Sequence, residues 1–562
     1  MAINLPLGID SFERLRTEKC YYIDKTELIK KLLDKSYTVN LITRPRRFGK
    51  TLTMRMLADF FDIQKDSSSR FAGLKISRHN ELCDQWMNQW PVLFITFKSV
   101  EGLSFESAYE MLEVLISDLY IEHLYLGTSS SVNEADQEYF QRFIAKKGSQ
   151  AELKNSLYIL MRMMHSHFGK PVILLIDEYD VPLAKANDYG YYEQILDVMR
   201  SMLGKVLKTN DFLKISVVTG CLKIAKESIF TGTNHFVSDT VTSNRFDAFF
   251  GFTEQEVYQL LEDTGFTDHV KIIKEWYDGY RFGSTDIYCP WDVLNYIGAL
   301  QDDPTHDPET YWANTSGNSI VRSFIKKANK STQHEIEQLI SGDGVAKKIS
   351  QELTYNELDK SIDNMWSVLF STGYLTQRGK TKSGALKLVI PNREVQEIFS
   401  TQILKWFEET VREKPAKLMA FCDALERGDA DSVQQQFNSY LLSTISIRDT
   451  AVRKELKENF YHGVLHGMLI GNDDWVVRSN EESGIGYCDI LVEIPGKSIG
   501  LAIEIKYAEN DLLDTGCKDA LNQIKNKQYA AKLQSDGMNK IYIYGIACYK
   551  KHCKAVCEEF CG

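Results

Sequence analysis

The sequence predicts an α/β protein with a parallel-sheet domain at its N-terminus, a helical middle region and a second, compact α/β domain at its C-terminus. Short Val/Ile/Leu runs alternate with long helical stretches through about the first 250 residues, as a parallel sheet covered on both faces requires. The last 110 residues instead order a helix, two strands, a helix and a strand. A length of 562 residues also exceeds what one core ordinarily organises, so we expect several domains.

Composition is that of a well-packed globular chain. A hydrophobic content of 43% and a formal charge of -11 argue against disorder and against non-specific coating of nucleic acid. The sequence contains no run of 18 uncharged apolar residues and begins without a basic-then-apolar leader, so we expect a cytoplasmic protein with no membrane association and with reduced cysteines. Cys553, Cys557 and Cys561 are spaced as on one helical face, where zinc is an alternative to simple burial.

Four apolar runs are expected to form the parallel strands of the N-terminal domain, which we assign to residues 1–250. Each run is bounded by turn residues or by a polar end, as buried strands are. The runs are "TVNLIT" (38–43), "VLFITF" (92–97), "PVILLIDE" (171–178) and "LKISVVTG" (213–220).

The middle of the chain is expected to be mainly helical. Residues 251–345 show helical spacing and are predicted to form a lid region. Residues 346–450 are predicted to be a winged-helix-like and helical connector, because "MWSVLFSTGYLTQRG" and "ALKLVIPNREVQEIFSTQIL" give helix, turn, two strands and helix. The alternative is a subdomain with a purely packing role, because such subdomains can have the same order of helix, turn, two strands and helix. Residues 451–562 are predicted to form the C-terminal α/β domain.

Residues 40–57, "NLITRPRRFGKTLTMRML", end a strand and begin a helix with most of a phosphate-binding P-loop. In such a loop, backbone N–H groups surround a phosphate, a lysine contacts it, and a hydroxyl holds Mg²⁺. Arg44 stands where the first glycine of the pattern G-x-x-x-x-G-K-[ST] belongs. We therefore predict a P-loop NTPase domain that binds ATP and Mg²⁺. The predicted nucleotide-binding residues are Arg47, Phe48, Gly49, Lys50, Thr51 and Leu52.

Two further strand ends carry suitable polar residues. Asp177 and Glu178 end "VILLIDE", where one carboxylate can position Mg²⁺ and the other can orient or deprotonate water. Thr219 ends the next strand and is a candidate for sensing the terminal phosphate. Capping of a strand by the acidic pair is the structural alternative. Arg245 is either an arginine finger or, more commonly for arginine, a structural residue.

Five stretches make the N-terminal half resemble the AAA-ATPase-like family of bacterial proteins, over roughly residues 4–290. The resemblance implies that Lys50 and Thr51 bind phosphate and Mg²⁺, that Asp177 supports the metal, and that Glu178 is the hydrolytic base. It also implies that an arginine at the first glycine position is ordinary for the family. The stretches are "YYIDKTELIKKLL", "LITRPRRFGKTLTMRML", "VILLIDEYDVPL", "GFTEQEV" and "WYDGYRFG".

The C-terminal domain places acidic residues and a lysine on two successive strands. Glu504 and Lys506 share one face of "SIGLAIEIK" because side chains alternate along a strand, and Asp489 lies on the preceding strand, "YCDILVEI". Two carboxylates can hold Mg²⁺ or Mn²⁺ for phosphodiester cleavage, and the lysine can position the attacking water. An ordinary Glu/Lys ladder on a solvated strand is the alternative.

This layout resembles the PD-(D/E)XK nuclease superfamily over about residues 450–550. The resemblance implies a restriction-endonuclease-like fold in which Asp489, Glu504 and Lys506 are catalytic. Glu458 is then a further metal ligand, and Gln523 contacts the site. Flanking stretches that resemble a nuclease-like domain commonly fused to this ATPase-like domain are "FYHGVLHGML", "RSNEESGIGYCDILV" and "LNQIKNKQYA".

The leading functional hypothesis is an ATP-regulated, metal-dependent nuclease whose partner is nucleic acid, more readily DNA than RNA. Eight lysines in residues 515–554 would hold the polyanion. The alternative is a signalling or scaffold ATPase whose nuclease-like domain binds nucleic acid or other partners without cutting. A third alternative makes ATP a structural ligand, and assembly into a homo-oligomer stays open.

Overall fold

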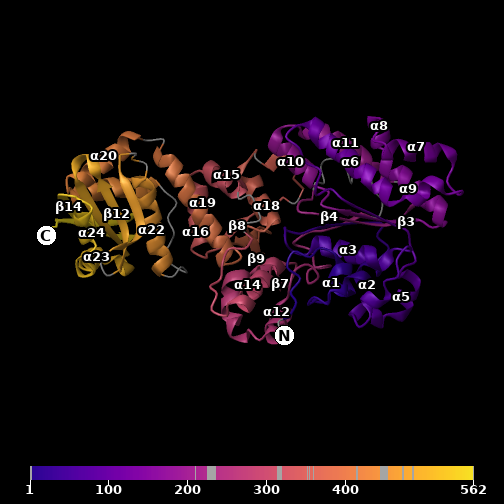
Figure 1. Ribbon diagram of the computed structural model, residues 1–562, viewed down its shortest axis with the longest axis horizontal. Coiled ribbons are helices and arrows are strands. Elements are labelled where there is room, and N and C mark those ends of the chain that lie inside the picture. Colours follow the sequence, from indigo (N-terminus) through magenta and orange to yellow (C-terminus); the bar gives the residue numbers. More distant parts are fainter. Residues whose placement is uncertain are drawn as a thin grey trace. The chain divides into compact units, whose positions relative to one another are not determined.

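The structure is a computed structural model that divides into two compact units, the first comprising residues 1–316 and 346–394 and the second residues 317–345 and 395–562 (Figure 1). Each unit is described by itself. The residues that the structure describes are 3–208, 210–223, 236–312, 319–350, 352–353, 355–358, 360–412, 415–443, 454–470, 472, 474–483 and 486–560.

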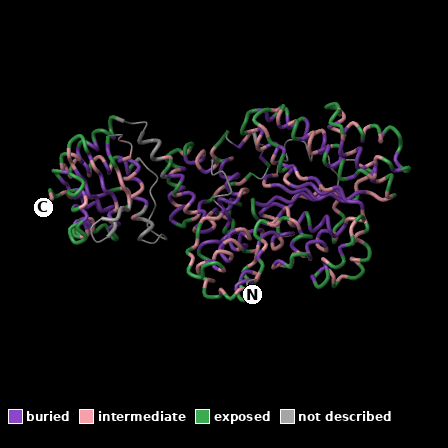
Figure 2. Tube along the Cα trace, in the orientation of Figure 1, coloured by how far each residue is buried: buried purple, intermediate pink, exposed green. Residues whose placement is uncertain are grey.

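The first unit is built on a parallel sheet of five strands in the order β2-β3-β4-β1-β5. The α/β class and the parallel sheet are therefore confirmed, with all four predicted strands present and one more beside them. The sheet is buried in the centre of this unit (Figure 2). Its strands are β1 (Val39–Thr43), β2 (Val92–Thr96), β3 (Val172–Asp177), β4 (Leu213–Gly220) and β5 (Phe236–Asp239).

Helices cover both faces of this sheet, with α1, α2 and α3 on one side and α6, α9 and α11 on the other (Figure 1). The continuous apolar strands follow from this two-sided cover. The helices of the first unit are α1 (Phe12–Thr17), α2 (Glu27–Leu33), α3 (Lys50–Phe61), α4 (Ser68–Phe71), α5 (Asn80–Trp86), α6 (Phe105–Glu122), α7 (Glu134–Ile144), α8 (Gln150–Leu153), α9 (Ser156–Phe168), α10 (Val181–Tyr189), α11 (Tyr192–Leu207), α12 (Glu254–Thr264), α13 (Val270–Tyr277), α14 (Pro290–Asp302), α17 (Tyr355–Leu358) and α18 (Ile362–Thr372).

Helix α12 begins where its sequence indicates. Thr253 accepts a hydrogen bond from the backbone N–H of Glu256, whose side chain accepts one from the N–H of Thr253. This reciprocal capping box satisfies two otherwise unpaired donors. The apolar face of α12 then packs with α13 and α14 in one core cluster that includes Leu260, Trp276 and Tyr296.

Two short hairpins complete the first unit. Strands β6 (Tyr280–Phe282) and β7 (Thr285–Ile287) pair antiparallel, as do β9 (Thr376–Lys380) and β10 (Leu386–Val389). Helix α18, this second hairpin and helix α19 (Arg393–Arg412) follow the predicted order of elements, with β8 (Val345–Lys347) before them. Helix α19 begins in the first unit and continues into the second.

The second unit contains a mixed sheet in the order β11-β12-β13-β14-β15, in which only β13 and β14 pair in parallel. This sheet and its helices confirm the predicted C-terminal α/β class. The strands are β11 (Val476–Ser483), β12 (Gly486–Ile494), β13 (Ile499–Tyr507), β14 (Lys540–Tyr549) and β15 (His552–Glu559). The helices are α15 (Ser319–Lys327), α16 (Lys330–Ile340), α20 (Pro415–Glu426), α21 (Ala430–Ser443), α22 (Lys454–Leu469), α23 (Leu513–Lys527) and α24 (Ala530–Ser535).

The prediction that the C-terminal cysteines share one face of a helix is wrong. Cys553 and Cys557 lie on strand β15, and Cys548 lies directly opposite Cys553 on β14. The run is a strand because it alternates side chains between a buried and a more exposed face. Cys561 lies outside the described residues.

Among the described residues, no helix combines the length and the apolar character needed to cross a membrane.

Candidate functional site

The predicted nucleotide loop connects the end of β1 to the first turn of α3. Gly49 precedes the helix with a φ of +80°, in the left-handed region that favours glycine. Arg47 takes the same region, with a φ of +71°, at an energetic cost that glycine would avoid. The loop therefore ends on a helix N-terminus, where backbone N–H groups are unpaired and attract anions.

Four of the predicted side chains meet at this helix N-terminus. The Thr51 hydroxyl donates to Asp177 Oδ2 at 2.8 Å, and the Thr219 hydroxyl donates to Asp177 Oδ1 at 2.5 Å. Lys50 Nζ donates to the backbone carbonyls of Arg44 and Pro45, at 3.0 and 2.8 Å. Lys50, Asp177 and Thr219 are buried. The parallel strand ends and the loop thus bring together a lysine, a carboxylate and two hydroxyls.

Glu178 follows Asp177 with a strained backbone, at a φ of +52°. Burial and then the negative charge of Asp177 raise the pKa of Glu178 above its ordinary value. The next residues are anchored: Asp180 accepts hydrogen bonds from the backbone N–H groups of Cys221 and Leu222, at 2.8 and 3.0 Å. Glu178 is therefore held at the strand ends, beside the Asp177 cluster.

The arginine at the first glycine position is a structural residue. The Arg44 guanidinium is fully buried and donates to the backbone carbonyls of Asp239 and Phe246, at 3.0 and 3.3 Å. Its backbone N–H donates to Gly220 O at 3.1 Å. Burial lowers the pKa of Arg44 to about 10, so the group stays charged at neutral pH. Arg44 ties the loop to β4 and to the segment after β5, and the turn does without the usual glycine.

Two predicted nucleotide-binding side chains pack against the β6–β7 hairpin and α14. The Phe48 ring is buried and lies 5.0 Å from the ring centroids of Tyr280 and Phe282. The Arg47 guanidinium lies over the Trp291 ring, 4.1 Å from its centroid. Leu52 is half-buried in the first turn of α3. The Phe48 side chain therefore holds the loop against this hairpin, and the assignment of residue 48 to the nucleotide stays a prediction.

Arg245 makes structural contacts. Its guanidinium donates to Asn40 Oδ1 at 2.9 Å and to Asp239 Oδ2 at 3.2 Å, and it lies over the rings of Tyr37 and Phe246. These contacts agree with the interpretation of Arg245 as a structural residue.

A buried acidic pair beside the loop was not foreseen. Asp292, in the first turn of α14, and Glu394, in the first turn of α19, are both fully buried, and Glu394 Oε1 accepts from Trp312 N at 2.5 Å. Burial raises the pKa of Asp292 to about 7. The sequence shows only a single acidic residue near the start of each of these two helices, which does not indicate that either residue is buried or that the two lie close together.

Asp292→Asn is expected to stabilise the protein above pH 7. The unfolded carboxyl loses its proton near pH 4, whereas the folded one keeps it to about pH 7, so the free energy of unfolding falls as pH rises through that window. Asn needs no ionisation, so we expect a gain of about 1–3 kcal/mol at pH 8 and a shallower pH dependence. Chemical denaturation at pH 5 and 8 measures both.

Asp302→Asn, an exposed position in the same helix, serves as the control for that measurement. It should leave the pH dependence unchanged. An Asp292→Asn protein with the same slope as wild type would show that Asp292 ionises normally in the folded state.

In the second unit, strands β12 and β13 place the predicted acidic residues next to each other. Ile490 pairs with Ile503, one position from Asp489 and Glu504 on their antiparallel strands. Asp489 Oδ2 accepts from the backbone N–H of Ile505 at 2.8 Å, and Glu504 Oε2 lies 3.5 Å from the backbone N of Asp489. Each carboxylate therefore contacts the strand that carries the other.

Lys506 and Glu458 complete this acidic cluster. Lys506 Nζ lies 2.9 Å from Glu504 Oε1. Burial opposes the charge on Lys506, but Glu504, then Glu458 and Asp489, raise its pKa overall. Burial and then the charge of Asp489 raise the pKa of Glu504 to about 7. Glu458, on α22, accepts from the backbone N–H of Tyr507 at 3.0 Å. The three acids and the lysine are thus electrostatically coupled.

The donor set suits a hard divalent cation, because carboxylate oxygens are the ligands that Mg²⁺ and Mn²⁺ prefer. Two carboxylates that repel each other in a buried site also gain from a cation between them. In the described part of the chain, however, no three His, Cys, Asp or Glu side chains already stand in a metal-binding arrangement. Gln523 donates to the hydroxyl of Tyr529 at 3.4 Å.

Four of the lysines in residues 515–554 form ion pairs, each within 4 Å of an acidic side chain. The pairs are Lys525 with Glu558, Lys540 with Glu559, Lys551 with Glu337, and Lys554 with Asp514.

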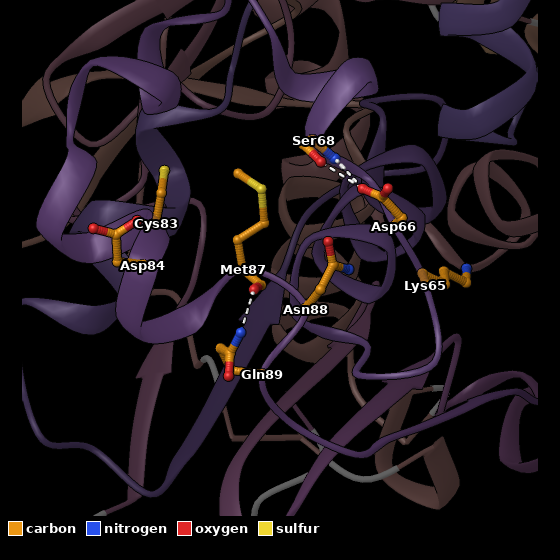
Figure 3. Close-up of a pocket in the computed structure, with 8 residues that line it drawn as sticks. All are labelled: Lys65, Asp66, Ser68, Cys83, Asp84, Met87, Asn88 and Gln89. Atoms are coloured by element: carbon orange, nitrogen blue, oxygen red, sulfur yellow. Dashed lines mark hydrogen bonds between the residues drawn. The ribbon is translucent and has the colours of Figure 1, made fainter.

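A pocket in the first unit is separate from both sites. Its lining residues come from the segment between α3 and α4, the start of α4, helix α5 and the turn that follows α5 (Figure 3). The polar groups there partly satisfy each other: Ser68 donates to Asp66, and Gln89 donates to the carbonyl of Met87 at 3.3 Å. None of the predicted site residues lines it.

Comparison with known proteins finds matches in two separate parts of the chain. Residues 6–230 match a family model described as a predicted AAA-ATPase, and residues 456–558 match one of the PD-(D/E)XK nuclease superfamily. The chain therefore carries an AAA-ATPase-like N-terminal domain and a C-terminal domain of the PD-(D/E)XK nuclease superfamily. Both resemblances stated from the sequence are confirmed.

One relative matches this chain along nearly its whole length at low identity. The chain is 25% identical over 561 residues to an "Uncharacterized protein in vnfD 5'region" of Azotobacter chroococcum mcd 1. The match covers 96% of each chain.

Proposed function

We propose that this protein is an ATP-regulated nuclease that requires a divalent cation and acts on DNA. The observation that carries the proposal is the convergence of Asp489, Glu504 and Lys506 on adjoining strands, with Glu458 beside them. Glu504 is buried beside the half-buried Asp489, and the cost of placing these two acids together is one that a surface for binding partners would not require.

At the proposed cleavage site, Asp489, Glu504 and Glu458 would hold Mg²⁺ or Mn²⁺. The cation would activate water for attack and neutralise charge on a phosphodiester. The backbone N–H of Ile505 orients the Asp489 carboxylate. Lys506 supplies a positive charge beside Glu504, where it can stabilise the anion that develops on the phosphate or position the attacking water.

At the proposed nucleotide site, Lys50 and the backbone of residues 47–52 would bind the phosphates of ATP. Thr51 and Asp177 would hold Mg²⁺, which offsets phosphate charge when bound. The Thr51–Asp177 hydrogen bond already aligns these two groups. Thr219 would contact the terminal phosphate, and Glu178, with its raised pKa, would act as the base toward water.

Residues 346–450 are proposed to relay nucleotide state, as a winged-helix-like and helical connector between the lid region 251–345 and the nuclease domain 451–562. Contacts within the first unit support this role. The hydroxyl of Thr376, on β9, accepts from the backbone N–H of Arg281, on β6. Because Phe48 packs on the same hairpin, a change in the loop reaches this segment directly.

A second candidate is a signalling or scaffold ATPase whose nuclease-like domain binds without cutting. The ion pairs of four lysines in residues 515–554 and the incomplete metal-binding arrangement in the described residues favour it.

The experiment that separates the two candidates is a cleavage assay with purified protein. Linear, circular and single-stranded DNA, and RNA, would be incubated with Mg²⁺ or Mn²⁺, with ATP added or omitted. We expect cation-dependent DNA cleavage whose rate changes with ATP. Intact substrates under every condition would reject the nuclease and favour the scaffold.

A further inference from the structure

Helix α22 presents polar side chains to the strands that carry the acidic cluster. It packs on β11, β12 and β13. Glu458, His462 and His466 are spaced four residues apart, which places them on one face of the helix. The Glu458 carboxylate holds the end of β13 through Tyr507 N. His462 is therefore one turn away from a group that already contacts the site.

His462 contacts the chain at Asp489 itself. Its Nε2 lies 2.8 Å from the backbone carbonyl oxygen of Asp489, on β12, and 3.1 Å from Ser479 Oγ, on β11. A carbonyl oxygen can only accept, so Nε2 carries the hydrogen in this contact. One imidazole thus connects the helix to two neighbouring strands at the level of the carboxylates.

Asp489 is then restrained from two directions. Its backbone is held by His462 and its carboxylate by Ile505 N, at 2.8 Å. Its partner Glu504 is almost fully buried and approaches the Asp489 backbone N at 3.5 Å. A shift of the Asp489 backbone therefore changes the distance between the Asp489 and Glu504 carboxylates. Cation binding is sensitive to shifts of its ligands well below 1 Å.

We propose that His462 is a positioning residue of the acidic site, whose Nε2–H fixes the backbone at Asp489 so that Asp489 and Glu504 share one divalent cation. This inference rests on the proposed nuclease function. The ring of His466, on the following turn, lies nearly parallel to that of His462, with centroids 6.0 Å apart and ring planes 9° apart. The contact acts on where Asp489 lies, and His462 need not touch substrate or cation.

The test compares two amide replacements in the full chain. Gln places its amide nitrogen where Nε2 lies, whereas Asn is too short to reach Asp489 O. Wild type, His462→Gln, His462→Asn and the control His552→Asn would be compared. His552 is a partly exposed histidine in the same unit, paired with Asp511. Mn²⁺ affinity would be measured by electron paramagnetic resonance, and kcat and KM on linear DNA by cleavage. Melting temperatures identify any unfolded variant.

We expect His462→Asn to weaken Mn²⁺ binding and lower kcat by about 10–100-fold. KM should change little, and His462→Gln should stay within about threefold of wild type. The control should match wild type. Wild-type-like Mn²⁺ binding in the Asn variant, or equal losses in folded Gln and Asn variants, would overturn the positioning role even if the enzyme cuts DNA. Wild-type protein that neither binds Mn²⁺ nor cuts would overturn the inference together with the proposed function.

Discussion

Asp489→Asn is expected to reduce DNA cleavage by at least about 10²–10³-fold while leaving the protein folded. The Asn side-chain oxygen can still accept the hydrogen bond from Ile505 N, so the strand pairing survives. What disappears is one negative charge of the pair that would hold the cation. The loss should appear in single-turnover cleavage of linear DNA at saturating Mg²⁺. Raising the Mn²⁺ concentration should recover part of the rate, because the remaining carboxylate still binds weakly.

The effect should be confined to the acidic cluster. Asp519→Asn changes the same residue type at an exposed position of α23 and should cleave like wild type. Asp489→Asn should also retain normal nucleotide binding. If Asp489→Asn cut DNA as fast as wild type, the cleavage would come from elsewhere in the protein or from a contaminant, and the proposed assignment of this site would be withdrawn.

Lys50→Ala is expected to weaken ATP binding by about 10–100-fold, the usual value of a charge-assisted hydrogen bond lost from a phosphate. Lys50 Nζ is now held by the carbonyls of Arg44 and Pro45, so it is already buried at the loop and needs only a short movement toward a ligand. Isothermal titration with ATP and Mg²⁺ measures the change.

Two further variants are needed to interpret the ATP titration of Lys50→Ala. Lys147→Ala, at an exposed position far along the chain from the loop, should bind ATP normally. Glu178→Gln should also bind ATP but release phosphate slowly, which would separate hydrolysis from a purely structural use of ATP. Unchanged affinity in Lys50→Ala would show that the loop does not bind the phosphates. Unchanged turnover in Glu178→Gln would remove that residue as the base.

Most of the fold was predictable because local periodicity records burial. The four apolar runs of the first unit are strands, since uninterrupted Val, Ile and Leu indicate cover on both faces. The predicted strands that carry Asp489 and Glu504 are present as well, because they too are rich in Ile, Leu and Val. Strands β5, β6, β7, β8, β11 and β15 were missed. Several of them carry many polar residues, as "FVSD" and "VVRSNEES" do, and depend on pairing with neighbours for their structure.

The candidate sites were predictable to the extent that parallel strand ends and strand alternation determine position. Asp177 and Thr219 meet because their strands are parallel neighbours that end at one edge. Glu504 and Lys506 share a face because they are two residues apart. The sequence identified Arg44 as an unusual residue at its position. Its buried guanidinium donates to the carbonyls of Asp239 and Phe246, 195 and 202 residues away, and no local sequence pattern predicts contacts at that distance.

Spacing within single elements was enough to predict the two domain classes, the lysine and threonine of the phosphate loop, and the carboxylates with their lysine. The folded chain was needed to show that Arg44 and Phe48 support the loop, that Asp292 and Glu394 are buried acids, and that His462 contacts Asp489. Those features depend on which distant segments pack together and how much water they exclude. Burial and proximity change a side chain's charge state and partners without changing its place in the sequence.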